Sequence, residues 1–134
     1  MHPDILQKIQ TYFSRQEGVI AVLLFGSRAK GRATAGSDVD VAVLYEENHV
    51  PDFRAQMNLK EELGRELRAE VDLAVLNKAN PILKHQIFTQ GKKILENDSS
   101  RTTAFQVRSL FQYDDLKRVR APIEKALLKG RVYG

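Results

Sequence analysis

The feature that most constrains this chain is an apolar run that ends in a glycine turn. The run from Val19 to Phe25 is continuously apolar, which predicts a strand covered on both faces in the centre of a sheet. Gly26 and Ser27 follow it directly and predict a tight turn, because glycine allows backbone angles and close approaches that a side chain prevents. A polar turn is therefore expected at the end of a rigid, buried element.

Two acids, Asp38 and Asp40, begin the next predicted strand, residues 38–45. One residue separates them, and alternate side chains of a strand share a face, so both carboxylates point the same way. They repel each other unless a cation lies between them, and Mg²⁺ commonly binds one or two carboxylates together with water and substrate phosphates. The alternative is that both acids are ordinary solvated side chains, because Asp-x-Asp alone is a weak motif.

Small and basic residues separate the turn from the acids. Ser27 offers a hydroxyl and a main-chain N–H to an anion, and Arg28, Lys30 and Arg32 supply positive charge. No Gly-Lys-Ser/Thr follows at the spacing of a Walker A loop, so an anion site of another kind is predicted. Residues 28–36 are expected to form a short helix followed by a loop.

Taken together, Gly26-Ser27 and Ser37-Asp38-Val39-Asp40 resemble the signature of the DNA polymerase β-type nucleotidyltransferases. The form Gly-Ser-Arg-Ala-Lys-Gly is most similar to the minimal nucleotidyltransferase (MNT) domains of that superfamily. The resemblance implies that Gly26, Ser27, Arg28 and Ser37 bind the nucleotide. It also implies that Asp38 and Asp40 bind two Mg²⁺ ions together with a third aspartate on a later strand.

Asp72 is the candidate for the third acid. It lies in the predicted strand 70–76 and alternates with Ala74 and Leu76, which places it on an otherwise apolar face. An unpaired carboxylate there would cost several kcal/mol or change its protonation state. A nearby metal pair removes the difficulty. The alternative is that Asp72 caps a loop or pairs with Arg28.

The implied fold is α+β (α/β): a polymerase β-like nucleotidyltransferase core with a small mixed sheet flanked by helices. Residues 1–97 are expected to form this core, and residues 98–134 a long helical extension of the same single domain. Residues 92–96 predict an edge strand or a turn. The residues expected on the apolar helix faces are Ile5, Ile9, Tyr12 and Phe13; Phe53, Met57, Leu63 and Leu67; Ile82, Leu83, Ile87 and Phe88; and Phe105, Leu110 and Phe111.

Pro122 lies inside the carboxyl-terminal helical pattern and predicts a break or kink near Arg120-Ala121, because proline removes an N–H and clashes with the preceding turn. The basic tail that follows fits either a solvated helix face or a surface for an acidic partner or nucleic acid. None of His2, His49 and His85 has a second histidine at metal-ligand spacing, so we assign all three to packing or to the surface.

Composition excludes several classes of function. The 134 residues include no cysteine, which removes disulfides, thiolate metal sites and cysteine nucleophiles. No apolar run approaches the roughly 20 residues of a membrane span, and the first residues lack the order of a signal peptide, so we expect a cytoplasmic protein. The net charge of +4 suits a triphosphate, an RNA or an acidic protein.

The resemblance implies transfer of AMP from ATP to a hydroxyl. Aminoglycoside nucleotidyltransferases and tRNA-adding enzymes resemble the same core but carry a large acceptor domain, which this chain has no room for. Minimal members of this size look like the MntA-type antitoxins, which add AMP units to a tyrosine of a HEPN ribonuclease toxin. A hetero-oligomer with such a toxin and no direct binding of nucleic acid are therefore expected.

Two alternatives stay open from the residues alone: adenylylation of a small molecule such as an aminoglycoside, and a catalytically silent module that only binds the toxin. The sequence leaves the base preference, the acceptor residue, the number of AMP units and the oligomeric state undetermined.

Overall fold

The computed structural model describes residues 3–26 and 38–133, with side chains for 4–26 and 38–118. In this part of the chain, four strands form one sheet in the order β3-β2-β1-β4. The central strand β1 (Val19–Phe25) pairs antiparallel with β2 (Val39–Tyr45) and with β4 (Lys92–Glu96), whereas β2 pairs parallel with β3 (Val71–Val75). The predicted mixed sheet is confirmed, and residues 92–96 form its edge strand.

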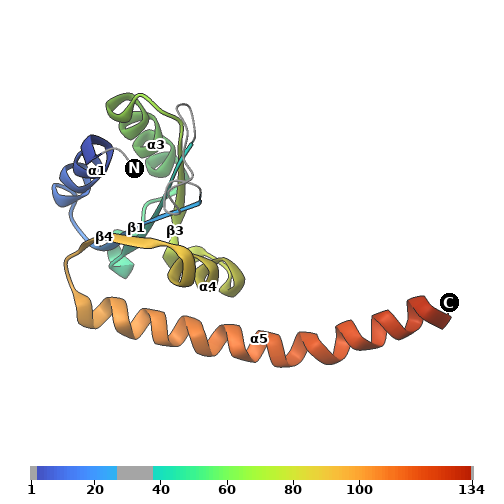
Figure 1. Cartoon of the computed structure of the whole chain (residues 1–134). Helices are drawn as coiled ribbons and strands as arrows, with labels where there is room; N and C mark the ends of the chain where they lie inside the picture. The colour runs from blue at the N-terminus through green and yellow to red at the C-terminus, as the bar shows by residue number, and fades with distance from the viewer. Residues whose placement is uncertain (1–2, 27–37, 134) are drawn as a thin grey trace.

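Helices cover both faces of this sheet (Figure 1). Helices α1 (Pro3–Ser14) and α3 (Phe53–Leu67) lie on one face, and α4 (Pro81–Gln90) and α5 (Ser99–Tyr133) lie on the other. The predicted α+β fold with a long carboxyl-terminal helix is therefore confirmed.

The alternation of β2 divides its side chains between two hydrophobic layers. Val41 and Val43 are fully buried in the layer under α1 and α3, whereas Ala42 and Leu44 belong to the layer under α4 and α5. Because Asp40 alternates with Ala42, it lies on the α4/α5 face of the sheet. The hydrophobic pattern of the strand thus fixes the direction in which the acid points.

Two helices begin directly after capping side chains. The Asp52 side chain accepts the Ala55 N–H at 2.8 Å and caps α3, and the Asn80 side chain accepts the Leu83 N–H at 2.8 Å and caps α4. Such caps satisfy backbone donors that have no partner inside the helix. Pro81, which follows the cap of α4, has no N–H to satisfy.

The predicted apolar face of α3 is partly wrong. Phe53 is 76% exposed and Met57 is 46% exposed, whereas Leu59, Leu63 and Leu67 form the buried face. These three leucines are spaced by four residues and so share one side of the helix, while Phe53 and Met57 lie roughly a quarter to a third of a turn away from it.

Three further side chains expected in the core are exposed: Ile82, Leu110 and Phe111, at 42%, 47% and 64%. Helix α5 instead turns its small residues Thr102 and Ser109 toward the core. Ser109 can be buried because its hydroxyl donates to the Phe105 carbonyl at 2.8 Å.

Of the break or kink predicted near Arg120-Ala121, the break is wrong, because α5 continues as one helix of 35 residues. Pro122 removes one main-chain hydrogen bond, which a helix can tolerate by bending, and α5 curves gently along its length (Figure 1). Among the described residues, no helix combines the length and apolarity that crossing a membrane requires.

Candidate active site

Asp40 and Asp72 lie side by side on neighbouring strands. They are register partners in the parallel pair β2/β3, so their side chains project from the same face of the sheet. Their carboxyl groups are close enough to share a hydrogen bond. Asp72 is exposed and Asp40 is half-buried, so the pair forms a small anionic site open to solvent.

The surroundings disfavour a charge on Asp40. Burial raises the pKa of the Asp40 carboxyl, and the neighbouring carboxylates of Asp72 and Asp38 raise this pKa further. Asp38 is exposed and lies just before β2. The acids of the Asp-x-Asp pattern and Asp72 therefore act on one another electrostatically, although they come from two strands.

Gly26 occupies the turn directly beyond β1. Its φ of +74° lies in the left-handed region that favours glycine. Its neighbour Phe25 is paired with Asp40 across the sheet, and a Cβ placed on Gly26 would overlap the Asp40 carboxylate. Glycine is therefore needed here both for the backbone angle and for the space occupied by the acid.

Three of the predicted nucleotide-binding residues, Ser27, Arg28 and Ser37, lie outside the described residues. Their assignment to the nucleotide therefore stays a prediction from the sequence. The same holds for the short helix and loop expected over residues 28–36.

The carboxylates suit Mg²⁺ chemically. Among the side chains described, those of residues 4–26 and 38–118, no three His, Cys, Asp or Glu converge closely enough to hold a metal by themselves. Mg²⁺ commonly needs only one or two carboxylates, because water and substrate phosphates fill its other positions. The adjacent carboxyls of Asp40 and Asp72, and the raised Asp40 pKa, mark a place where a divalent cation would relieve repulsion.

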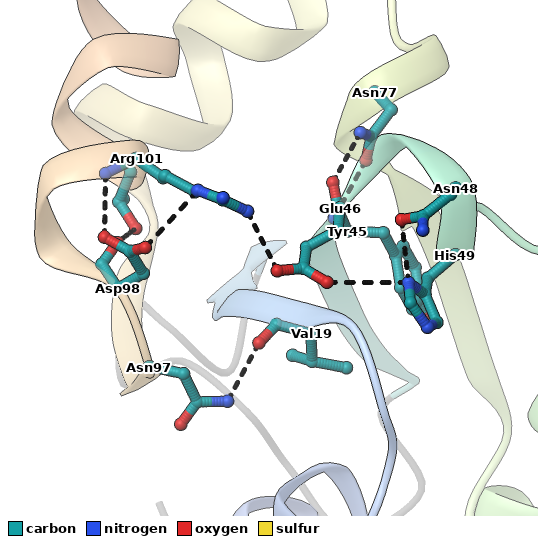
Figure 2. A network of polar contacts seen from close by, with 10 residues as sticks. Val19, Tyr45, Glu46, Asn48, His49, Asn77, Asn97, Asp98 and Arg101 are labelled. Atoms are coloured by element: carbon teal, nitrogen blue, oxygen red, sulfur yellow. Dashed lines mark hydrogen bonds and ion pairs between the residues drawn. The ribbon is translucent and has the colours of Figure 1, made fainter.

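A second polar cluster lies at the opposite end of the sheet, where β2 finishes and α5 begins (Figure 2). Arg101 donates to Glu46 at 2.8 Å and also forms an ion pair with Asp98 at 3.4 Å. Asn97 donates to the Val19 carbonyl at 2.9 Å. These contacts attach the start of α5 to the central strand and to the residue after β2.

Two short 3₁₀ helices complete this cluster, η1 (Glu47–His49) after β2 and η2 (Leu76–Lys78) after β3. Asn77 in η2 donates to the Tyr45 carbonyl at 2.8 Å and accepts the Tyr45 N–H at 2.9 Å, so it replaces a missing strand partner. The prediction for His49 is confirmed, since it lies on the surface, 3.5 Å from Glu46.

The sequence interpretation also missed a groove beside Asp72. Met57, Lys60, Gly64 and Arg65 line it from α3, and Asp72 lies among the residues of its other wall. The spacing of these four α3 residues places them along one side of a helix, which is the signal that could have indicated a shared surface. The spacing did not identify a groove from the sequence, because the same residues also fit the ordinary solvated face of a helix.

A family model described as polymerase beta nucleotidyltransferase matches residues 7–100. The protein adenylyltransferase MntA of Shewanella oneidensis is 32% identical over 102 residues, which is 76% of this chain and 71% of that protein. The region that the family model matches contains Gly26, the paired strands and the acids.

Two solved structures share the fold over nearly the whole chain. One is a toxin–antitoxin crystal structure with AMP-PNP, with a TM-score of 0.81, 28% identity, and coverage of 92% of this chain and 98% of the other. The second is a complex of tri-AMPylated Shewanella oneidensis HEPN toxin with MNT antitoxin, with a TM-score of 0.76, 26% identity, and coverage of 92% and 96%. With its strands, glycine turn and acids in this arrangement, the chain belongs to the polymerase beta nucleotidyltransferase family.

Proposed function

We propose that this chain is an antitoxin that transfers AMP from ATP to a hydroxyl of a HEPN ribonuclease toxin and thereby neutralises it. The observation that carries the proposal is the adjacent pair Asp40 and Asp72 beside the Gly26 turn. The likeness to a complex that holds an AMPylated HEPN toxin supports the choice of acceptor. We propose a tyrosine as the modified residue and a hetero-oligomer as the working assembly.

Asp38, Asp40 and Asp72 would hold two Mg²⁺ ions. Bound Mg²⁺ neutralises charge on the triphosphate and lowers the pKa of the acceptor hydroxyl. Gly26 leaves room for the Asp40 carboxylate beside the turn at which the triphosphate would bind. Ser27, Arg28 and Ser37 would bind the triphosphate, as a hydroxyl and a guanidinium suit phosphate oxygens.

The exposed Asp72 carboxylate would accept the proton of the attacking hydroxyl. The hydroxyl oxygen forms a bond to the α-phosphorus of ATP, the bond from that phosphorus to the bridging oxygen breaks, and pyrophosphate leaves. Because attack and departure are in line, the acceptor must approach from the side opposite the leaving pyrophosphate. The chain therefore has to hold the acceptor hydroxyl and the pyrophosphate on opposite sides of the α-phosphorus.

The test incubates the purified chain with a HEPN protein encoded beside it, Mg²⁺ and ATP carrying the label on either the α- or the γ-phosphorus. AMP transfer predicts label on the HEPN protein from α-labelled ATP only, and a loss of its ribonuclease activity. A tight complex without label would instead establish a binding module and overturn the proposal. Labelling of an added aminoglycoside without labelling of the HEPN protein would establish a small-molecule adenylyltransferase.

A further inference from the structure

A groove of about 610 Å³ runs between α3 and β3 and reaches Asp72. Its volume lies in the range of about 300–1,000 Å³ that is typical of ligand sites. Apolar Met57, which is 46% exposed, contributes to one wall, and the residues around Val71 at the start of β3 contribute to the other. The groove is therefore an open channel along the edge of the sheet, on the side of α3, and Asp72 is one of its lining residues.

Strand β3 has a free backbone edge in the described part of the chain, since it pairs there with β2 alone. The Glu70 carbonyl accepts the Val39 N–H at 2.9 Å and so points toward β2. Backbone groups alternate in direction along a strand, so Val71 and Leu73 direct theirs away from β2. Such an edge can bind an extended peptide by main-chain hydrogen bonds.

The wall between α3 and β3 is preformed. Helix α3 ends with Arg68 in the left-handed conformation, at φ 54°, and the Arg68 N–H bonds the Gly64 carbonyl. The Ala69 N–H bonds the same carbonyl at 3.2 Å, and a Cβ on Gly64 would lie only 3.1 Å from the Ala69 oxygen. A ligand in this groove would therefore meet a surface that needs little ordering on binding.

We propose that the edge of β3 beside this groove binds the acceptor, as an extended, hydroxyl-bearing segment of the acceptor protein that pairs with β3. Because side chains alternate along such a segment, those on the α3 side would occupy the groove, and the hydroxyl side chain would lie on the α4/α5 face beside the Asp72 carboxyl. The inference rests on the proposed function, because it assigns a place to that reaction's second substrate. Gly26 flanks Asp40 from β1, whereas the groove reaches Asp72 from the far side of β3. A nucleotide beside Gly26 and an acceptor at the edge of β3 would thus reach the acids from different strands, which is compatible with in-line transfer.

The charges of the groove favour recognition by shape and main chain. Lys60 and Arg65 line it together with Glu61, Glu70 and Asp72, so neither sign dominates. A test that depends on charge reversal would therefore be ambiguous, and a steric test is sharper.

The absence of cysteine from the chain makes such a test direct, because one introduced cysteine can be labelled alone. Arg65 is exposed and lines the groove, so Arg65→Cys carrying a fluorescein maleimide adduct would block the groove. Lys78→Cys with the same adduct is the matched control, because Lys78 is also exposed but follows the other end of β3. The probes are α-labelled ATP with the HEPN protein, and AMP-PNP for nucleotide binding.

We expect the Arg65→Cys adduct to lower kcat/KM for the HEPN protein by at least about tenfold, with the Kd for AMP-PNP within about twofold of the parent. The labelled Lys78→Cys chain should transfer AMP at about the parent rate, and the unlabelled Arg65→Cys chain is the reference that separates the effect of the adduct from that of the substitution. Normal transfer by the Arg65→Cys adduct would overturn the groove as the acceptor site and leave the proposed function intact. An absence of transfer by the parent chain would overturn both.

Discussion

The two ends of the sheet differ in how their charged side chains are arranged. At the end where β2 and β3 begin, Asp40 and Asp72 face each other, and the Asp40 pKa is raised by burial and by its acidic neighbours. At the other end, where β2 finishes, the Glu46 carboxylate meets the Arg101 guanidinium at 2.8 Å (Figure 2). One end holds like charges together, and the other pairs opposite charges.

The end with Asp40 and Asp72 is suited to chemistry, whereas the end with Glu46 and Arg101 attaches helices to the sheet. Paired charges and amide hydrogen bonds hold α5 and η2 against the strands without requiring any other molecule. Adjacent carboxylates are costly unless a cation binds, so they persist where a ligand provides the compensation. Substitutions at the first end should therefore change activity, and substitutions at the second should change stability alone.

The largest effect is expected from Asp38→Ala combined with Asp40→Ala. Transfer of AMP should fall by at least about a thousandfold, because the groups that would hold Mg²⁺ are lost. The fold should persist, since the change removes repulsion in the metal-free protein. Transfer is measured with α-labelled ATP, and circular dichroism with thermal melting checks the fold. A double variant that transfers AMP at the parent rate would remove these acids from the mechanism.

Gly26→Ala should have the next largest effect. The left-handed backbone angle costs a non-glycine residue about 1–2 kcal/mol, and the new methyl group would displace the Asp40 carboxylate. A displacement of about 1 Å at a reacting site can lower the rate by about a hundredfold. Kinetics and chemical denaturation measure the two losses separately, and a variant with parental kinetics would show that the turn does not set the position of Asp40.

Asp40→Asn should stabilise the metal-free chain. Because the folded-state pKa of Asp40 is raised, the parent is most stable below the unfolded-state pKa of about 3.9 and loses stability as the pH rises through the folded-state pKa. The variant avoids this loss, so its Tm should exceed that of the parent by about 2–5 °C at pH 7 and match it near pH 3.

Mg²⁺ provides the complementary measurement for Asp40→Asn. Addition of the ion should raise the Tm of the parent, because binding to the folded state alone stabilises it, and should leave the Tm of the variant nearly unchanged. Equal shifts in both proteins would place the bound ion elsewhere.

The smallest effect is expected from Arg101→Ala at the opposite end of the sheet. Arg101 is exposed, and such an ion pair contributes at most about 1 kcal/mol to the free energy of unfolding. That contribution should shrink in high salt, and AMP transfer should stay at the parent rate. Urea denaturation at two salt concentrations measures the first effect. A large loss of transfer would mean that the two ends of the sheet are coupled.

Much of the fold could be predicted because local signals and long-range packing agree. The apolar run of β1 predicts a central strand, and residues 92–96 form the edge strand that was one of their two predicted structures. The position of Asp72 followed from alternation within β3 and from the family resemblance. The structure adds that β2 and β3 are parallel and pairs Asp72 with Asp40.

The remaining features depend on how helices rotate against the sheet. The sequence presents Leu110 and Phe111 as core residues, but α5 packs through Thr102 and Ser109 instead. Hydrophobicity alone does not distinguish these faces, because a small residue can be buried when its hydroxyl bonds the preceding turn. The groove beside Asp72 could not be predicted from the sequence either, because it forms only when α3 packs beside β3.

The parallel register of β2 and β3 also limits which insertions and deletions this chain can tolerate. Adding or deleting one residue between Leu67 and Val71 would turn Asp72 to the opposite face of the sheet and present Val71 and Leu73 to the other layer. A change of two residues would restore the face but shift the acid along the strand by about 6.6 Å. The length of this short connection is thus as strictly constrained as the identity of the acid that follows it.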